Sequence, residues 1–459
     1  MNPALILALR PGATLLERDA EADIQLWHGI VRVSCPSGGV RSALRELAKG
    51  ADRARLDRIV VDADGDAGLA MWYYQLAHLE ARGAVSFELR DANCTVARAV
   101  VTSRVFHPAL DASPLAGRWV LDRFAYLRRA ESGVVLESAR SSVQIALLEP
   151  VGMSVVSALA SPIAWDTFPD RVSQELLTLF AYCGMLAPAD VADTNPSTAA
   201  WHFADLLCHA RTRARRDVGL DALPTQRSLP PSPVVKAPMS SESIALHVPD
   251  LARLDAQDVP FSRVLEGRRS VRDYGARPIT ARQLGELLYR AARIQRVTDA
   301  DADRVPYATS RRPYPGGGAC YELEVYAVVG ECDGLGRGLY HYDPLQHRLE
   351  VLAVSVSHVD RLLDDSARSA DVAGGRQLLL VITARFHRFM WKYGLGSYAA
   401  IMKNTGVLLA TMQLVATAMG LAPCALGGGD SELFALAIGT PFEEETSVGE
   451  LMLGSAPRR

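Results

Sequence analysis

The sequence predicts an α+β protein in two halves, and three observations carry that prediction. Strand-like and helical segments are mixed, without the regular strand–helix alternation of a doubly wound parallel sheet. Five prolines fall between Pro224 and Pro238, where they disfavour helix and favour an extended linker. The N-terminal half also repeats one order of elements about a hundred residues apart. With 459 residues, the chain has room for about three folding units.

The repeated order in the N-terminal half is strand, helix, helix, strand. In the first copy the segments 30–33, 41–50 and 69–81 precede a stop at Gly83, with Trp72 and Tyr73 placed on one helical face. In the second copy the segments 143–148, 153–161 and 172–182 precede a stop at Gly184. Each copy resembles a winged-helix module, so we predict two such modules, residues 1–105 and 106–220, the second with a helical extension. Neither second helix carries the polar stripe that reads base edges, so we expect no nucleic acid partner.

A Pro-rich linker is predicted over residues 221–239 and a further domain over 240–459. In this domain Thr280 and Gln283 form a capping box before an amphipathic helix. The segments 322–330 and 377–386 are strand-like, and residues 338–352 predict a hairpin turning at Asp343–Pro344. The chain closes on a short apolar strand at 450–454.

Bulk properties exclude several classes of protein. The net charge of −3 argues against a protein that coats nucleic acid or an acidic membrane. The stretch Asn404–Gly429 has no charge and is long enough to span a bilayer, but polar residues and Pro423 interrupt it, so we expect a buried or interface helix and no membrane partner. The first ten residues predict no signal peptide. Seven scattered cysteines show no metal-ligand spacing and suit a reducing cytoplasm.

Two motifs in the C-terminal half are suited to binding an anionic, flat ligand. Arg268, Arg269, Ser270 and Arg272 place three guanidinium groups and a hydroxyl within five residues, which suits a phosphate dianion. A solvated surface cluster is the simpler alternative. The run 312–319, RPYPGGGA, has glycines that permit close backbone approach to a flat ligand. Its alternative is a flexible loop.

Two further motifs lie nearer the C-terminus. Lys392 and Tyr393 stand side by side among aromatic residues, where a lysine with a lowered pKa could act as a base. The alternative is a lysine whose stem only lies along Trp391. The run 424–430, CALGGGD, exposes backbone N–H groups directly after the charge-free helix.

Taken in order, these motifs resemble the nitroreductase superfamily of FMN enzymes. More narrowly, they resemble its SagB/McbC-type branch, the thiazole/oxazole-forming peptide dehydrogenases. The matching text is RRSVRDYG, RPYPGGGACYELEVYAV, GLYHYDPLQHRLEVL, the run from WKYG to ALGGGD, and ELMLG, which together cover about 260–455. Longer members carry winged-helix-like N-terminal modules that resemble leader-peptide recognition modules.

The resemblance implies a role for each matched residue. Arg268, Arg269 and Ser270 would hold the FMN phosphate and ribityl chain, and Arg272 would lie near the pyrimidine edge. Pro315, Gly317 and Gly318 would line the isoalloxazine ring, whereas family members usually have serine where Gly316 stands. Leu426, Gly427 and Gly428 would present backbone to the ring, or to the phosphate across a dimer interface. Lys392 and Tyr393 would be catalytic, and no metal is implied.

The function that the resemblance implies is oxidation of thiazoline or oxazoline rings in a ribosomally made precursor peptide. An azoline-containing peptide and a YcaO-type cyclodehydratase are the expected partners, with a cytoplasmic homodimer whose seam is the helix 404–420. The sequence leaves open whether Lys392 or Tyr393 is the base. Two other functions also stay open: a general NAD(P)H-dependent nitro- or quinone reductase of the same superfamily, and a flavin-free winged-helix regulator.

Overall fold

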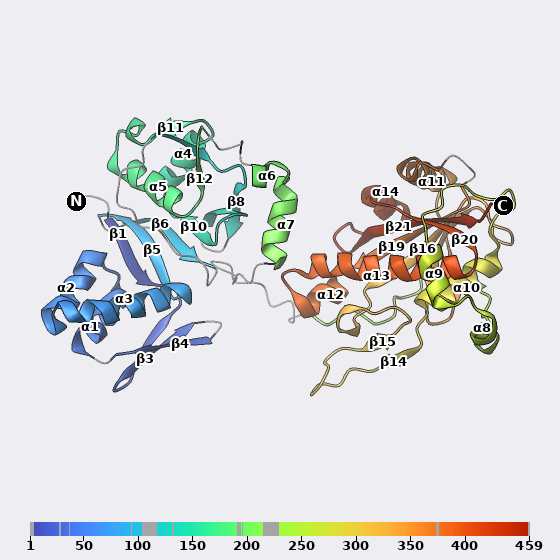
Figure 1. Cartoon of the computed structure of the whole chain (residues 1–459), viewed down its shortest axis with the longest axis horizontal. Coiled ribbons are helices and arrows are strands. Elements are labelled where there is room, and N and C mark those ends of the chain that lie inside the picture. Colours follow the sequence, from blue (N-terminus) through green and yellow to red (C-terminus); the bar gives the residue numbers. More distant parts are fainter. Residues whose placement is uncertain are drawn as a thin grey trace. The chain divides into compact units, whose positions relative to one another are not determined.

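The computed structural model describes residues 4–26, 29–35, 37–92, 94–102, 117–130, 133–190, 194, 196–213, 229–372 and 376–457. The chain divides into two compact units, Met1–Pro224 and Thr225–Arg459 (Figure 1). This division falls inside the predicted Pro-rich segment.

The first unit contains, in order, β1 (Ala4–Leu9), β2 (Thr14–Glu17), β3 (Glu21–Leu26), β4 (Gly29–Ser34), α1 (Gly38–Lys49), α2 (Arg53–Asp64), α3 (Asp66–Ala81), β5 (Val85–Asp91), β6 (Cys94–Val101), β7 (Arg118–Leu121), β8 (Ala125–Ala130), β9 (Gly133–Ser138), β10 (Val143–Leu147), α4 (Pro150–Ala158), β11 (Ile163–Ala164), η1 (Trp165–Thr167), α5 (Arg171–Tyr182), β12 (Leu186–Pro188), α6 (Pro196–Ala199) and α7 (Phe203–Arg213).

One six-stranded sheet joins the two predicted N-terminal modules. Its order is β1-β5-β6-β10-β9-β8, and the pairing of β6 with β10 crosses the boundary predicted after residue 105. Smaller three-stranded sheets, β2-β3-β4 and β11-β7-β12, accompany the helices of each module. The larger apolar core of this unit contains residues of both predicted modules, from Leu7 to Leu186, so the modules share both a sheet and a core.

The predicted helices of this unit are present, with one difference in the buried face. Trp72, Leu76 and Leu79 of α3 are buried, as the 3.6-residue period predicts. Tyr73, predicted on the same face, is instead exposed, and its hydroxyl donates to Asp57 of the neighbouring helix α2 at 2.9 Å. In α5 the predicted face of Leu176, Leu179 and Phe180 is buried.

The second unit contains, in order, β13 (Ser243–Ala245), α8 (Leu251–Gln257), α9 (Phe261–Gly267), α10 (Ala281–Ala292), β14 (Arg296–Thr298), β15 (Thr309–Arg311), η3 (Gly317–Ala319), β16 (Leu323–Val329), β17 (Gly338–Asp343), β18 (Arg348–Leu352), α11 (Val356–Ala370), β19 (Leu378–Arg385), α12 (Phe386–Tyr393), α13 (Ser397–Ala418), β20 (Leu421–Ala425), α14 (Ser431–Ile438) and β21 (Glu445–Ser455).

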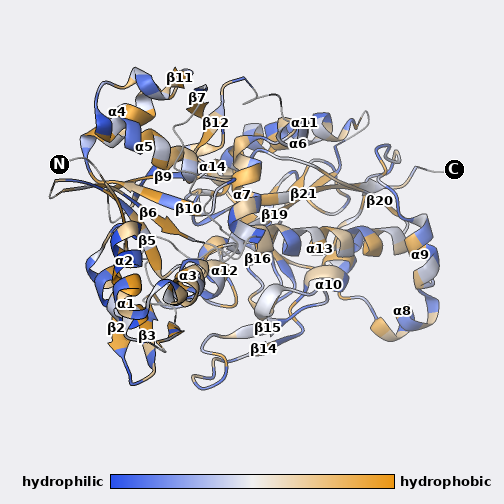
Figure 2. Cartoon of the chain, turned by 60° about the vertical axis from the view of Figure 1, so that its left-hand side comes forward, coloured by the Kyte–Doolittle hydropathy of each residue, from blue (hydrophilic) through white to orange (hydrophobic). Residues whose placement is uncertain are grey.

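An antiparallel seven-stranded sheet, β13-β18-β17-β16-β19-β21-β20, forms the centre of this unit. The side-chain period of two sends Val325 into a core with α10 and α13, and its neighbour Tyr326 into a second core with α11 and α14. Both faces of the sheet are therefore covered by helices, and the central strands are strongly apolar (Figure 2). The predicted strands, the hairpin β17–β18 and the α+β class are confirmed.

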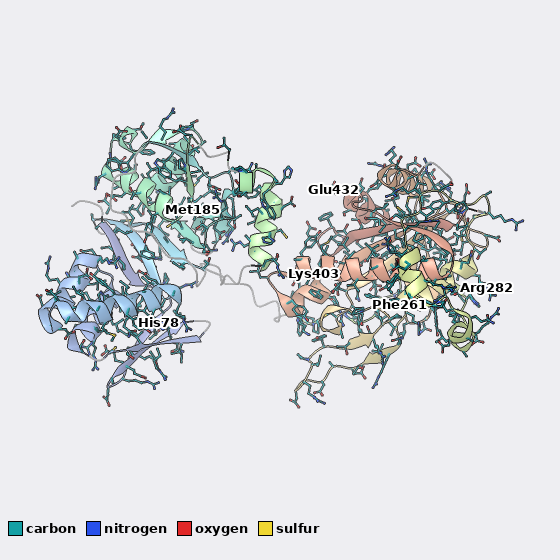
Figure 3. The ribbon with its side chains drawn as sticks, in the orientation of Figure 1. His78, Met185, Phe261, Arg282, Lys403 and Glu432 are labelled. Carbon is teal, nitrogen blue, oxygen red and sulfur yellow. The ribbon has the colours of Figure 1, made fainter. Side chains whose placement is uncertain are left out.

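The long helix α13 packs one face on the sheet. Ile401, Thr405, Leu408 and Met412 are buried there at three- and four-residue spacing. Lys403 is the only charged residue of the helix (Figure 3). Among the described residues, α13 is the one helix long and apolar enough to cross a membrane, and 28% of its most apolar window is buried. Much apolar surface on α13 is thus left uncovered within one chain.

The Pro-rich segment is docked on the second unit along its described part, residues 229–239, which we call the strap. Residues 221–228 of the predicted linker lie outside the described residues. The ammonium of Lys236 donates to Tyr326 Oη at 2.7 Å and to Glu445 Oε2 at 2.5 Å, and the backbone N–H of Met239 donates to Glu350 at 2.9 Å. The described part of the predicted Pro-rich linker is thus bound to the second unit, because side chains of this unit take up hydrogen-bonding groups of the segment.

Thr280→Ala is expected to destabilise the second unit. The Thr280 hydroxyl accepts from the backbone N–H of Gln283 at 3.1 Å, and the Gln283 side chain accepts from the N–H of Thr280. Losing such a cap costs about 1 kcal/mol, which lowers the unfolding temperature of a unit this size by about 2–4 °C. Calorimetry of the full chain would measure the shift. Thr298→Ala, at an exposed position, is the matched control, and an equal shift in both variants would contradict the cap.

Candidate active site

Lys392 lies at the C-terminal end of α12, against a tyrosine from a distant loop. Its ammonium donates to the hydroxyl of Tyr307, which itself donates to the carbonyl of Gly318 at 2.8 Å. The Lys392 Nζ also lies 4.9 Å from the centre of the Tyr307 ring and 5.1 Å from that of Tyr393. We call Tyr307, Gly317, Gly318, Lys392 and Tyr393 the lysine cluster.

The electrostatic surroundings of Lys392 differ from the sequence-based expectation. Burial alone would lower the pKa of the ammonium, but the hydrogen bond to Tyr307 and the nearby Tyr393 and Cys320 together raise it above its ordinary value. The expectation of a lowered lysine pKa is therefore wrong in direction. At neutral pH Lys392 carries its proton and presents a positive charge.

The glycines of the run 316–318 pack against their own chain. A Cβ on Gly316 would lie 3.0 Å from the Tyr321 ring, and one on Gly317 would lie 3.0 Å from the Phe389 ring. Gly318 has a φ of +58°, and a Cβ there would meet Lys392 Nζ and Tyr393 Oη. The glycines thus let the turn approach α12 closely. This packing explains the glycines without a ligand, whereas the sequence-based hypothesis explained them by the approach of a flat ligand.

A second group, Arg268, Arg269 and Ser270, lies near the C-terminal end of α13; we call it the arginine cluster. Both guanidinium groups are exposed, and among the described residues neither pairs with a carboxylate. The Arg268 Nη1 lies 3.5 Å from the side-chain oxygen of Gln413, its one hydrogen-bond partner in the described part of the chain. Arg269 lines a hollow of about 450 Å³ that also contains Arg263. Positive charge is therefore available here for an anion.

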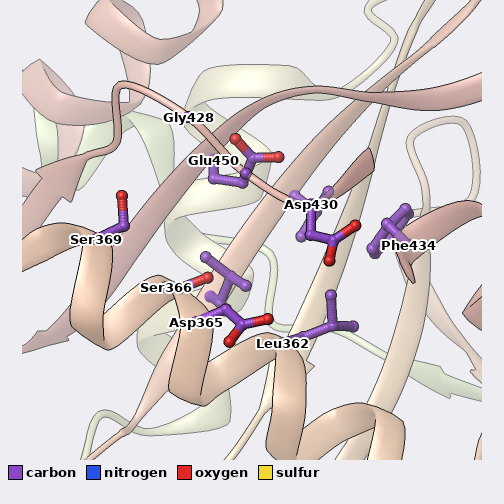
Figure 4. A pocket seen from close by; sticks show the side chains of 11 residues that line it. Leu362, Asp365, Ser366, Ser369, Gly428, Asp430, Phe434 and Glu450 are labelled. Atoms are coloured by element: carbon purple, nitrogen blue, oxygen red, sulfur yellow. The ribbon is translucent and has the colours of Figure 1, made fainter. Parts of the chain in front are cut away.

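Leu426, Gly427 and Gly428, the glycine bend, follow the edge strand β20. The N–H of Leu426 donates to the carbonyl of Glu450 at 3.0 Å, whereas a Cβ on Gly427 or Gly428 would meet nothing within 4 Å. Gly428 borders a hollow of about 280 Å³ that also contains Asp365, Asp430 and Glu450 (Figure 4). The exposed backbone of the bend can be approached closely by a ligand.

The arginine cluster and the glycine bend fit the two ends of an FMN molecule. The N–H of Val271, the residue after Ser270, donates to the carbonyl of Pro423 in β20 at 2.9 Å, and the bend directly follows this strand, so the cluster and the bend lie along the same edge of the sheet. Unpaired guanidinium groups and a hydroxyl suit a phosphate, and open glycine backbone suits a ring edge. Arg268, Arg269, Ser270 and the bend would hold FMN here, where the flavin would supply hydride chemistry.

Arg272 and Pro315, which were also predicted to contact FMN, are not part of the arginine cluster or the glycine bend. The Arg272 Nε donates to the carbonyl of Ala370, the last residue of α11, at 2.8 Å. Its side chain is thus engaged at a helix end, and a flavin contact would require this bond to break. Pro315 is exposed at the entry to the glycine turn. Its role at the ring stays a prediction.

The lysine cluster and the arginine cluster lie on opposite sides of α13. Asn404 accepts from the N–H of Gly317 at 3.3 Å, whereas Gln413 contacts Arg268. Nine residues separate Asn404 from Gln413, which is about 14 Å along the helix and about half a turn around it. One chain therefore does not bring the two clusters to the same side of α13.

Sequence reasoning missed two residues of this site, Tyr307 and Arg388. Tyr307 lies 85 positions before its partner Lys392, and no local pattern marks it. Arg388 is buried one helical turn before Lys392 and donates to three backbone carbonyls. Two cations at i and i+4 repel each other on a helix, and that spacing was the available signal.

Two protein-family models match the chain. Residues 265–455 match the nitroreductase family, and residues 119–218 match the family described as cyanobactin oxidase ThcOx. The C-terminal part of the chain is thus a nitroreductase-family domain.

The chain is also similar to individual proteins of that kind. It is 33% identical over 123 residues to the trifolitoxin-processing protein TfxB of Rhizobium leguminosarum bv. trifolii, covering 25% of this chain and 32% of that protein. It is 33% identical over 116 residues to the microcin B17-processing protein McbC of Escherichia coli, covering 24% and 42%. A protein of Methanocaldococcus jannaschii named as a nitroreductase is 28% identical over 187 residues, covering 40% and 85%. The resemblance to SagB/McbC-type proteins is therefore confirmed.

Solved structures similar to the chain include a nitroreductase of Ralstonia eutropha, with a TM-score of 0.37, 21% identity, and coverage of 50% of this chain and 96% of that one. The E. coli microcin synthetase McbBCD complex with truncated pro-MccB17 bound matches with a TM-score of 0.34, 23% identity, and coverage of 46% and 84%.

Tyr307→Phe is expected to lower the pKa of Lys392. The variant removes the hydroxyl that raises this pKa and leaves the effect of burial, which lowers it. The chain has four lysines, Lys49, Lys236, Lys392 and Lys403, so reductive ¹³C-methylation and NMR titration can resolve each one. Tyr340→Phe, which removes a hydroxyl bonded to Gly336, is the control. An unchanged or higher pKa in Tyr307→Phe would contradict the assigned contact.

Proposed function

We propose that the protein is an FMN-dependent dehydrogenase that oxidises thiazoline or oxazoline rings in a ribosomally made precursor peptide to thiazoles or oxazoles. The observation that carries this proposal is the lysine cluster, in which a protonated lysine and Tyr393 lie beside a glycine turn of a nitroreductase-family domain. Similarity to two peptide-processing proteins, TfxB and McbC, supports a peptide substrate.

The reaction removes a proton from one ring carbon and a hydride from its neighbour. FMN, held by Arg268, Arg269, Ser270 and the glycine bend, would supply the hydride-accepting chemistry. Lys392 carries its proton at neutral pH and so has no free electron pair to act as a base. We therefore assign the proton-abstracting role to Tyr393, whose phenol would first release its own proton to solvent so that the phenolate takes the ring proton. The Tyr393 ring is 43% exposed and stacks on Phe389 at 4.6 Å. The Lys392 ammonium would stabilise the negative charge on the phenol oxygen after it gives up its proton. Tyr307 and Gly318 hold that ammonium in place.

A homodimer with shared active sites is part of the proposal. The arginine cluster and the lysine cluster lie on opposite sides of α13, so a second copy packed along the same helix would bring one cluster of each chain to a common site. The uncovered apolar surface of α13, including Tyr398 and Met402 at 48% and 43% exposure, suits such a seam.

An open sheet edge in the first unit supports recognition of the precursor peptide. Among the described residues, β4 pairs only with β3, and its outer positions Ile30, Arg32 and Ser34 are exposed. An extended leader peptide could add a strand to this edge through main-chain hydrogen bonds. A YcaO-type cyclodehydratase would supply the azoline rings, and the proposed compartment is the cytoplasm.

A general NAD(P)H-dependent nitro- or quinone reductase is the competing function, because one relative is named as a nitroreductase. Rapid bleaching of bound flavin by NADPH under anaerobic conditions would favour the reductase. Flavin that stays oxidised with NADPH and bleaches with an azoline peptide would favour the dehydrogenase. Purified protein without flavin absorbance would exclude both flavin enzymes and leave the winged-helix regulator as the remaining hypothesis.

Mass spectrometry tests the proposed reaction directly. With FMN and an azoline peptide, the wild type is expected to remove the mass of two hydrogens per ring. Lys392→Ala and Tyr393→Phe should keep FMN and lose about 10²-fold or more in rate, as expected for general acid–base groups. Lys49→Ala, at an exposed site in the first unit, is the matched control. If both site variants retain near-normal ring oxidation, the assignment is wrong.

Mixing two inactive variants tests the shared site. If each site takes residues from both chains, subunit exchange between equal amounts of Arg269→Ala and Lys392→Ala should restore about a quarter of the wild-type rate. About half of the dimers are then mixed, and each mixed dimer has one intact site of two. The matched control mixes wild type with the double variant, in which every mixed dimer has one defect in each site. Absence of recovery in dimers shown by native mass spectrometry to be mixed would contradict site sharing.

A further inference from the structure

Arg388 is a buried cation without a carboxylate partner. Its side chain is 3% exposed, and no ion pair to it is found among the described residues. Burial, together with the neighbouring Arg385, lowers the pKa of its guanidinium to about 10. Burying an unpaired charge is costly, so the surrounding groups must compensate.

Three backbone carbonyls provide that compensation, one for each guanidinium nitrogen. Nε donates to Cys320 at 2.9 Å, Nη1 to Ser232 at 2.6 Å and Nη2 to Ala308 at 2.5 Å. Charge-assisted bonds of this kind are stronger than bonds between neutral groups. The planar guanidinium therefore joins three segments that are distant in the sequence.

Each of the three segments also contacts Lys392 or its helix. Ala308 directly follows Tyr307, which accepts from Lys392, and Cys320 lies two residues after Gly318, whose carbonyl accepts from Tyr307. Ser232 belongs to the strap, whose Leu229 carbonyl accepts from the Trp391 indole at 2.7 Å. The Trp391 ring in turn meets the edge of the Tyr307 ring, with centroids 5.9 Å apart.

The strap follows α12 over most of the length of this helix. The Ser232 hydroxyl pairs with His387 at 3.0 Å, and the Arg385 guanidinium donates to the Pro233 carbonyl at 2.8 Å. With Arg388 and Trp391, four residues of the segment 385–391 contact the strap. Prolines limit the conformations of such a segment, so it can hold a helix in place with little further loss of entropy.

We propose that Arg388 is the positioning residue of the active site, joining the strap, the Tyr307 loop and the glycine turn to α12 so that the Lys392 ammonium stays on the Tyr307 hydroxyl. The guanidinium acts through Lys392 and does not itself touch substrate. The catalytic consequence rests on the proposed function, whereas the position of Lys392 does not.

The test compares Arg388→Ala with wild type in the full-length FMN-loaded protein. Misplacement of a catalytic group by about 1 Å costs about 10²-fold in rate, so kcat for azoline oxidation should fall by about that factor with KM within twofold. Guanidinium ion, added well below denaturing concentration, should restore at least a tenth of the lost rate by entering the vacated site. Arg337→Ala, which removes a guanidinium that pairs with Asp360 at the surface, is the matched control.

The pKa of Lys392, measured by NMR of the ¹³C-methylated protein, tests the proposal independently of turnover. Removing a nearby cation by itself would raise this pKa, whereas separating Lys392 from Tyr307 would lower it. A lower pKa in Arg388→Ala, reversed by guanidinium ion, supports positioning. An unchanged or higher pKa, or a loss of kcat that guanidinium ion does not reverse in protein with wild-type circular dichroism, overturns it. If the wild type does not oxidise azolines at all, the proposed function fails and the NMR result still decides the role of Arg388.

Discussion

The packing of α13 on the sheet is the constraint on which the site depends. Because Thr405 and Leu408 face the sheet, Asn404 and Gln413 are turned to opposite flanks of the helix. Each flank holds one part of the site, a lysine on the first and arginines on the second. The helix thus separates the protonated Lys392 from the exposed guanidinium groups of Arg268 and Arg269 within one chain, and its uncovered apolar surface is where we propose that a second chain packs.

Lys392 depends on residues that lie far from it in the sequence. Its charge is stabilised mainly by Tyr307. The pKa of the Tyr307 hydroxyl is itself raised overall, because the effects of burial and of Cys320 outweigh the lowering by Lys392. A hydrogen bond between two such groups keeps the proton on the amine. The protonated lysine is therefore a property of the folded loop and not of the aromatic residues beside it in the sequence.

Local patterns made much of the second unit predictable from sequence. The capping box of Thr280 and Gln283, the strands 322–330 and 377–386, and the hairpin at Asp343 all follow from neighbouring residues, and all are present. The docking of the strap was not predictable, because its hydrogen-bonding partners lie 90 or more positions away in the sequence. The shared sheet of the first unit was missed for the same reason, since the pairing of β6 with β10 joins segments that each look complete alone.

An arginine at position 388 is favoured by geometry over any neutral side chain. Three carbonyls approach from three directions, and only a guanidinium offers N–H donors on three nitrogens held in one plane. A glutamine has two N–H donors on one nitrogen and would leave at least one of the three buried carbonyls without a partner, at a cost of about 1–3 kcal/mol. A lysine in its place would be a single point donor. The burial of an unpaired cation is thus the consequence of joining three backbone segments at one point, and the segments that meet there are those that surround Lys392.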